Sequence, residues 1–465
     1  MSQPLYHDLS GDRLTVANDP ARLAWNDTLE AMMAHAAATP EHLARTLAAD
    51  PDFALAHAAK GLMLLSLARA ELVGAARECL LQARASAGLR PVTRREAMVI
   101  EALSLWLDDA PRRAAERLEA ILLAHPHDVL ALKLSHGLRF ILGDQQEMLA
   151  TLQRFAPGFG EHHPLAGYVN GCHAFALEER GFYAEAERTG RRAVALSPRD
   201  AWGRHAVAHV LEMTGRAGEG IAWLGDGRGI AHANNLRFHI FWHLALFRLE
   251  RGENAEVLRL YDEEIRAEPT DDYRDIANGA SLLARLDHAG VDVGDRWEEL
   301  AAKAEGRVHD GRLVFADLHY VLSLLGAGHR GGAEAIAADL MHDARSHASR
   351  ERAAAARSGA FAARGLIAFS EGDHPEAARL LGMARDGLLA IGGSHAQRDI
   401  FEQIHIESLI RAGSHDLAGR LLEQRLARRG GANRFAVRRL AQLRHHAPGR
   451  LAALAVAATP LAIAH

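Results

Sequence analysis

The chain contains few lysines, and it has no excess of positive charge. Lysine occurs only at Lys60, Lys133 and Lys303, so that arginine carries almost all of the positive charge, a bias typical of GC-rich bacterial genomes. The net charge of −5 excludes the basic surface that nucleic-acid-binding proteins and proteins on anionic membranes require. We therefore expect neither nucleic acid nor membrane among its partners.

Cysteine is also scarce, and long apolar runs are missing. The two cysteines, Cys79 and Cys172, lie far apart, which excludes a disulfide framework and a cysteine-based zinc motif. Residues 1–20 lack the apolar segment of a signal peptide. The apolar stretch from Leu451 to Ala464 is shorter than the about 20 residues that span a bilayer, and Pro460 interrupts it. These features predict a cytoplasmic protein.

The sequence has no convincing alternating strand and no linker that divides it into separate domains. Helical periodicity runs through almost every segment instead. Between residues 186 and 196, for example, Ala186 and Ala193 are apolar while Glu187 and Arg191 are charged, as in an amphipathic helix with one buried stripe. With a hydrophobic content of 49%, the chain has enough apolar residues for a continuous core.

Helical hairpins recur about every 34 to 38 residues, the spacing of stacked helical repeats. In three copies a proline (Pro126, Pro198 or Pro269) lies 17 residues after the turn residue. The eight predicted turn residues are Asp109, Gly143, Gly181, Gly215, Gly252, Gly328, Gly372 and Gly413. A small residue follows five positions later in six of them, where it allows the two helices to approach; Met148 and Val257 occupy that position in the other two.

Two further helical pairs are predicted outside this pattern, at residues 53–85 and, less regularly, at residues 270–310. In the second pair we expect Trp297 to be buried and to anchor the pair. We divide the chain into an N-terminal extension (1–20), a helical repeat array (21–445) and an apolar tail (446–465). The predicted fold is all-α, a right-handed superhelix of stacked tetratricopeptide-like hairpins.

The array resembles the tetratricopeptide repeat, and more specifically the tetratricopeptide repeat protein 38 family, whose bacterial members are called StaR-like. The resemblance rests on residues 200–202 (DAW), 205–209 (HAVAH) with Glu212 and Met213, 239–244 (HIFWHL), 296–297 (RW) and 392–399 (GGSHAQRD). It implies the architecture and leaves the activity open. We expect no cofactor.

In tetratricopeptide hairpins the first helix lines a concave groove, and the resemblance therefore selects candidate ligand-binding residues in three neighbouring hairpins. They are Tyr168, Phe175, Glu178, His205, His209, Glu212, His239 and Trp242. His243 is expected nearer the packing side. A one-residue slip in the register would scatter this set.

The spacing of His205 and His209, at i and i+4, stacks two imidazoles on one helix face, and His239 and His243 repeat it. Three interpretations are open: histidines in interhelical hydrogen bonds, histidines that contact a polar ligand, and a metal site with His205, His209 and His239 as candidate ligands. The pattern is not H-E-x-x-H, because Ala206 stands where the catalytic glutamate would be. Interhelical hydrogen bonding is the commonest role in helical arrays, so we predict no bound metal.

The segment from Gly392 to Asp399 is the second candidate. Ser394 and Gln397 have the spacing of a capping box, which predicts a helix start. His395, Arg398 and Asp399 remain as candidates for binding a polar or anionic ligand near that helix start. The alternative for Arg398 is an ion pair with an acidic residue of a neighbouring hairpin.

We predict that the array curls until this segment approaches the groove. The predicted function is binding of a small polar ligand, a peptide or a protein partner, with homodimerisation left open. The alternative is an enzyme, with or without a metal ion, that acts on a small metabolite enclosed by the superhelix. An open groove would favour binding, whereas convergence of His205, His209 and His239 in an enclosed cavity would favour the enzyme.

Overall fold

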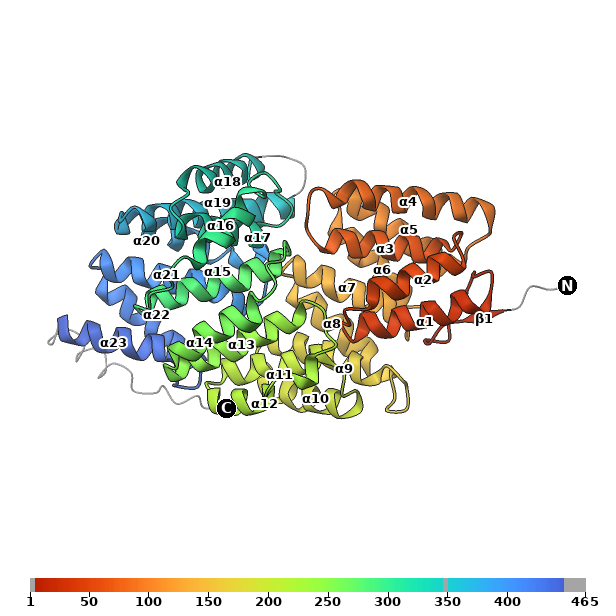
Figure 1. Ribbon diagram of the computed structural model, residues 1–465, viewed down its shortest axis with the longest axis horizontal. Coiled ribbons are helices and arrows are strands. Elements are labelled where there is room, and N and C mark those ends of the chain that lie inside the picture. The colour runs from red at the N-terminus through yellow and green to blue at the C-terminus, as the bar shows by residue number, and fades with distance from the viewer. Residues whose placement is uncertain (1–4, 346–349, 447–465) are drawn as a thin grey trace, which may run out of the picture.

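The computed structural model describes residues 5–345 and 350–446, and this part of the chain is all-α (Figure 1). One short antiparallel hairpin, β1 (Tyr6–His7) with β2 (Arg13–Leu14), precedes the helices, so the expectation of no strand is wrong at these four residues. The N-terminal helices are α1 (Asp19–Met33), α2 (Thr39–Ala49), α3 (Ala54–Ser66), α4 (Leu72–Leu89), α5 (Arg94–Leu107), α6 (Pro111–Leu122), α7 (Val129–Ile141), α8 (Gln145–Phe155) and the 3-10 helix η1 (Ala156–Gly158).

The central helices follow as hairpins along one side of the molecule. They are α9 (Ala166–Glu179), α10 (Tyr183–Leu196), α11 (Ala201–Met213), α12 (Ala217–Leu224), the 3-10 helix η2 (Arg228–Ile230), α13 (Leu236–Arg251), α14 (Asn254–Leu260), the π-helix η3 (Tyr261–Ile265), α15 (Tyr273–His288) and α16 (Arg296–Glu305). The C-terminal helices are α17 (Val314–Gly326), α18 (Arg330–Asp343), α19 (Arg350–Ser370), α20 (His374–Arg385), the 3-10 helix η4 (Leu388–Ile391), α21 (His395–Arg411), α22 (His415–Arg428) and α23 (Arg434–His446).

The eight predicted turns are confirmed. Each turn residue lies between the two helices of a hairpin, and each has a positive φ, from 57° at Asp109 to 81° at Gly181. Seven of them are glycines because this left-handed region is open to glycine without steric cost. The small residue five positions later is buried, and at Gly220 an added Cβ would lie 2.4 Å from the ring of Phe247. The sequence therefore specifies both the turn and the close helix approach.

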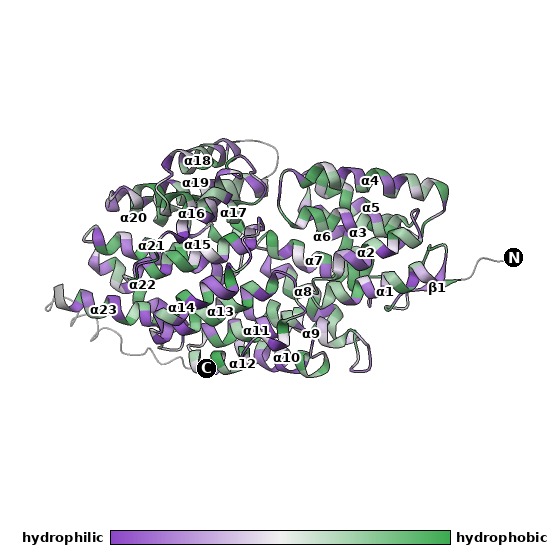
Figure 2. Cartoon of the chain, viewed as in Figure 1, coloured by the Kyte–Doolittle hydropathy of each residue, from purple (hydrophilic) through white to green (hydrophobic). Residues whose placement is uncertain are grey.

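The hairpins stack on one another through their amphipathic faces. Helix α9 packs against α10 and α11, and α11 in turn packs against α12 and α13. Figure 2 shows hydrophobic and hydrophilic positions mixed along each helix, as expected for elements with one buried side. The predicted irregular pair is α15 with α16, and Trp297 is buried against Gly326 of α17, as expected.

The N-terminal helices α1–α8 and the C-terminal helices α15–α21 face each other across the molecule (Figure 1). Two ion pairs join them: Arg307 Nη1 lies 2.8 Å from Glu71 Oε1, and Arg352 Nη1 lies 3.5 Å from Asp109 Oδ1. At Gly143 the backbones approach so closely that an added Cβ would lie 1.9 Å from the carbonyl oxygen of Leu389. The two ends of the array therefore enclose a space between them.

The ends of the chain differ from the predicted division. Residues 5–18 pack on the array: Asp8 accepts a hydrogen bond of 2.8 Å from Arg95, and Leu14 and Val16 are buried. Helix α1 already begins at Asp19. Of the predicted tail, only His446 at the end of α23 falls within the described residues. No helix in the described ranges is both long and apolar enough to cross a membrane.

Candidate functional site: a cavity beside a histidine cluster

A cavity of about 510 Å³ lies between the two ends of the array. Its walls come from α1, α2, α3, α5 and α7 on one side and from α11, α13, α15, α17 and the residues around the start of α21 on the other. Gly393, Ser394 and Gln397 line it together with His205 and His239. The prediction that the 392–399 segment approaches the groove of the histidine hairpins is confirmed.

The cavity wall is apolar and aromatic with a positive charge balance. Its aromatic residues are Trp106, Phe140, Trp202, Tyr273 and Phe315. Its charged residues are Lys60, Lys133 and Arg274, and no aspartate or glutamate lines it in the part of the chain that the structure describes. Two of the three lysines in the sequence thus face the same space.

Lys133 belongs to a group of side chains that sequence reasoning missed. Its Nζ lies 2.8 Å from His35 Nε2 and 5.0 Å from the ring centroid of Trp202. The His35 ring is stacked on Trp202 at 5.1 Å, and His35 has a φ of 54°, which is rare for a residue other than glycine. Burial and the neighbouring Lys133 hold the pKa of His35 well below its ordinary value, so a neutral imidazole accepts the lysine hydrogen bond. The rarity of lysine is typical of GC-rich genomes, so the sequence alone does not select Lys133.

Four buried histidines form a cluster next to this cavity. His205 and His209 come from α11, and His239 and His243 come from α13, with exposed fractions of 2%, 0%, 8% and 0%. One ring nitrogen from each lies within 4.8 Å of the corresponding atoms of the others. The predicted convergence of His205, His209 and His239 is therefore present. His243, expected nearer the packing side, is fully buried and does not line the cavity, whereas His205 and His239 do.

The second ring nitrogen of three of these histidines faces an oxygen atom. His239 Nδ1 lies 2.8 Å from Asn278 Oδ1, and His243 Nδ1 lies 3.0 Å from Glu212 Oε2. His209 Nδ1 lies 3.4 Å from Glu178 Oε2. His205 Nδ1 is buried without a hydrogen-bond partner in the described ranges. Glu178 and Glu212, both predicted from the repeat register, therefore flank the cluster rather than a solvent-filled groove.

Burial determines the charge of these groups. It lowers the pKa of His205, His239 and His243 well below the ordinary histidine range, and neighbouring histidines lower each of them further. Burial also lowers the pKa of His209 and raises that of Glu178 well above the usual carboxyl range. At neutral pH the four imidazoles are therefore uncharged, and each ring has one nitrogen with a lone pair.

The helix start at Ser394 is confirmed. Ser394 Oγ accepts a hydrogen bond of 3.3 Å from the Gln397 amide, and the Gln397 side chain accepts one of 3.0 Å from the Ser394 amide. His395 Nε2 lies 3.5 Å from Glu179 and 3.8 Å from Glu178, which connects this segment to the histidine cluster. Arg398 donates hydrogen bonds to the carbonyl oxygens of residues 392 and 393, so its guanidinium stabilises the turn that precedes α21.

Two of the predicted aromatic residues pack against rings of the histidine cluster. Phe175 stacks on His205 at a centroid distance of 5.5 Å, and Trp242 stacks on His239 at 5.1 Å. Both are fully buried, and neither lines the cavity. Tyr168 is buried two turns before Phe175 on α9 and does not line it either.

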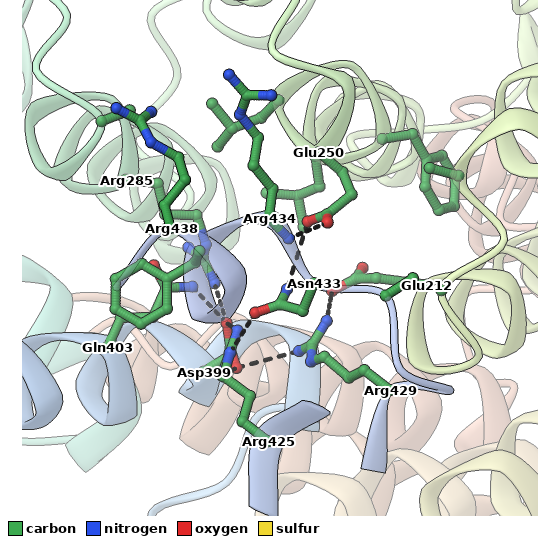
Figure 3. Close-up of a pocket in the computed structure, with 18 of the residues that line it drawn as sticks. Glu212, Glu250, Arg285, Asp399, Gln403, Arg425, Arg429, Asn433, Arg434 and Arg438 are labelled. Atoms are coloured by element: carbon green, nitrogen blue, oxygen red, sulfur yellow. Dashed lines mark hydrogen bonds and ion pairs between the residues drawn. The ribbon is translucent and has the colours of Figure 1, made fainter. Parts of the chain in front are cut away.

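Asp399 lies in a different place, a smaller cavity of about 90 Å³ that Glu212 also lines (Figure 3). Arg425 Nη2 and Arg429 Nη2 donate to its two carboxylate oxygens at 2.8 Å and 3.0 Å, and Gln403 Nε2 donates at 2.7 Å. In Figure 3 these side chains point toward Asp399 from α21, α22 and the start of the loop that follows α22. The carboxylate is thus saturated by protein donors, and we call this group the arginine–aspartate cluster.

No known protein-family model matches this sequence.

Proposed function

We propose that the protein binds a small amphipathic anion in the cavity between the two ends of its array. The observation that carries the proposal is the composition of the wall, which combines aromatic and aliphatic surface with Lys60, Lys133 and Arg274 and, in the described ranges, no acidic side chain. A volume of about 510 Å³ falls in the range of small-molecule sites. Such a wall favours a ligand with an apolar body and a carboxylate, sulfonate or phosphate group.

Lys133 is the best candidate for contacting the anionic group. Its side chain is half-buried, and its hydrogen-bond partner in the cavity wall, His35, is neutral. Lys133 also interacts with Cys172, at 3.6 Å, and with the buried Asp200, and neither of these lines the cavity. Arg274, by contrast, already donates to both oxygens of Asp272, at 2.8 Å and 2.6 Å. An anion that enters the cavity therefore has its strongest electrostatic attraction to Lys133.

The test compares an anionic and a neutral apolar probe in the untagged full-length protein. We would titrate 1-anilinonaphthalene-8-sulfonate and the uncharged N-phenyl-1-naphthylamine into wild type and Lys133→Met. The sulfonate Kd should rise about tenfold, about 1.4 kcal/mol, while that of the neutral probe stays the same. Lys303→Met is the matched control, because Lys303 pairs with Asp271 away from the cavity. Equal losses in the two lysine variants would refute the proposal.

A second variant tests the cavity itself. Gly137 of α7 lines the cavity, and a Cβ added there would meet no other described atom within 4 Å. Gly137→Phe should fill the space and abolish binding of both probes while leaving the helix intact, since any residue but proline suits a helix better than glycine. Gly74→Phe is the control, because Gly74 of α4 is exposed and equally unobstructed.

A second candidate function is catalysis on a small metabolite, and the convergence of His205, His209 and His239 beside the cavity supports it. Neutral buried imidazoles are suited to proton transfer. Incubation of the protein with a metabolite extract, followed by mass spectrometry, tests this function. Turnover that persists in a His205→Gln/His239→Gln variant would argue against the cluster as its catalyst.

We further propose that the hairpins are tetratricopeptide-like units of a right-handed superhelix and that the chain is a cytoplasmic member of the tetratricopeptide repeat protein 38 family. The regular turn residues support the first part, and the segments 239–244 and 392–399, which carry the resemblance, both contribute to the cavity. Both cysteines are free and buried, which suits a reducing compartment. A family alignment that leaves His205, His239 and Gly393 unmatched would contradict the assignment.

A further inference from the structure

We propose that His205, His209, His239 and His243 bind one divalent late transition-metal ion, Zn²⁺ or an ion of similar preference. This inference goes beyond the proposed ligand binding and does not depend on it, because the metal can be measured with the cavity empty. Imidazole nitrogen is a preferred ligand of this class of ion. The nitrogens of His205 and His209 lie 2.8 Å apart, and no pair in the cluster exceeds 4.8 Å. These separations bracket the about 3.3 Å expected between ligands with bonds of about 2.0 Å in tetrahedral coordination.

The positions of the ring protons carry the argument. A neutral imidazole has one N–H and one lone pair. The Nδ1 atoms of His239 and His243 face acceptor oxygens of Asn278 and Glu212, so their protons are on Nδ1 and their Nε2 atoms present lone pairs. His205 and His209 share one hydrogen bond between their Nε2 atoms, which uses a single proton. Three lone pairs and one proton are therefore present on the four Nε2 atoms. The lone pair of His243 Nε2 has no partner in the described ranges, and a cation would satisfy it.

The oxygen partners have the arrangement of groups that orient metal ligands. Histidines that bind a metal through one nitrogen donate the other N–H to a carboxylate or an amide oxygen, which holds the ring in place. Glu212 and Asn278 face His243 and His239 in this way. Glu178 lies 3.4 Å from His209 Nδ1, on the corresponding side of that ring, without a hydrogen bond to it. Glu212, Asn278 and Glu178 come from different helices, α11, α15 and α9, so the cluster is held from three sides.

Unsatisfied polar atoms provide an independent indication. Within the described ranges His243 Nε2 and both carboxyl oxygens of Glu178 are buried without a hydrogen-bond partner. Buried polar atoms are normally paired, because leaving one unpaired costs about 1–3 kcal/mol. A divalent cation would bind the nitrogen directly and supply positive charge close to the buried carboxyl. Two of the four histidines, His205 and His239, also line the cavity, so the ion would face whatever binds there.

The first experiment measures metal binding by the untagged full-length protein after chelator treatment. Zn²⁺ is titrated in competition with a chromophoric chelator, and elemental mass spectrometry gives the stoichiometry. One equivalent should bind, and His243→Gln should weaken binding at least about 100-fold. His319→Gln is the matched control, because His319 is buried and has an unpaired nitrogen but no histidine neighbour in the cluster. Failure of the wild type to bind Zn²⁺ stoichiometrically, or unchanged binding in a folded His243→Gln, would overturn the proposal.

A spectroscopic variant keeps the proposal testable should His243→Gln fail to fold. Co²⁺ takes the place of Zn²⁺, and His209→Cys replaces one imidazole by a thiol. A thiolate-to-cobalt charge-transfer band should then appear in the near ultraviolet, which requires residue 209 to contact the metal. The same band should be absent from wild type and from His319→Cys. Absence of the band in a His209→Cys protein that holds cobalt would remove His209 from the ligand set and overturn the four-histidine site.

Discussion

The histidine cluster and the arginine–aspartate cluster are neighbours, and Glu212 contacts both. Its Oε2 lies 3.0 Å from His243 Nδ1, and its Oε1 lies 3.4 Å from Arg429 Nη1. Both clusters are buried and polar, and both join helices from distant parts of the chain. They differ in how their polar atoms are paired. Asp399 has donors on both oxygens, whereas Glu178 has hydrogen bonds on neither within the described residues.

This difference separates a structural contact from a candidate site. Asp399 pairs with both Arg425 and Arg429, and Arg429 also pairs with Glu212 of α11. The two carboxylate oxygens of Asp399 therefore have no hydrogen-bonding capacity left for a ligand. The histidine cluster has lone pairs and carboxyl oxygens that the protein leaves without donors. Burial alone therefore does not mark a functional group; burial together with unused hydrogen-bonding capacity does.

The largest effect on stability is expected from a substitution in the arginine–aspartate cluster. Asp399→Asn removes the negative charge between Arg425 and Arg429 and leaves two buried guanidinium groups without it, which should lower the free energy of unfolding by about 3–5 kcal/mol. Urea denaturation measures the change. Glu101→Gln, which affects the exposed pair with Arg117, should cost less than about 1 kcal/mol and serves as the control.

The next largest effect on stability concerns the histidine cluster. Zn²⁺ at about one hundred times its Kd should raise the free energy of unfolding by about 2.7 kcal/mol, because the ion binds only the folded state. Thermal denaturation with and without zinc measures the gain. The His319→Gln variant should retain this zinc-dependent gain in stability, and the His243→Gln variant should lose it. A gain of the same size in both variants would place the metal elsewhere.

The pH dependence of stability should have opposite signs at two buried carboxyl groups, Asp200 and Asp399. Burial raises the pKa of Asp200, just before α11, to about 7, so its contribution to stability is present below pH 4 and declines as the pH rises toward 7. For Asp399, Arg425 and Arg429 outweigh burial and hold its pKa well below the usual range, so its contribution is present above pH 4 and declines only in more acidic solution.

Asp200→Asn tests this contrast. Relative to wild type, the variant should gain about 2 kcal/mol in unfolding free energy between pH 5 and pH 7, because one pKa unit corresponds to about 1.4 kcal/mol. Urea denaturation at the two pH values gives the difference. If the difference in unfolding free energy between the variant and the wild type is the same at pH 5 and pH 7, Asp200 is ionised at no cost in the folded protein.

The smallest effect is expected at His209 in the metal-free protein. His209→Gln should cost only about 1 kcal/mol, because the neutral ring has one hydrogen bond to His205 and otherwise faces an unpaired carboxyl. Denaturation after chelator treatment measures it. A loss as large as that of Asp399→Asn would make the histidines structural and would remove the difference between the two clusters.

The sequence predicted which residues belong to the site more accurately than it predicted which residues they contact. It selected His205, His209, His239, Glu178 and Glu212 from their register in the tetratricopeptide repeat that the chain resembles, and the structure brings them together. It placed Asp399 beside them, although Asp399 binds Arg425 and Arg429, which come from sequence positions that no local pattern connects to it. It missed Lys133 and His35, because they reach the cavity from the opposite end of the array.

The helices and the hairpins follow from local features of the amino-acid sequence. Amphipathic periodicity sets the buried face of each helix, and a left-handed turn residue such as Gly181 sets each reversal, so these are local properties of the chain. Only the tertiary structure decided which polar residues meet. Closure of the array brings α1–α8 against α15–α21 and forms the cavity, and whether a buried group such as Asp399 or Glu178 is paired depends on side chains that are distant in sequence.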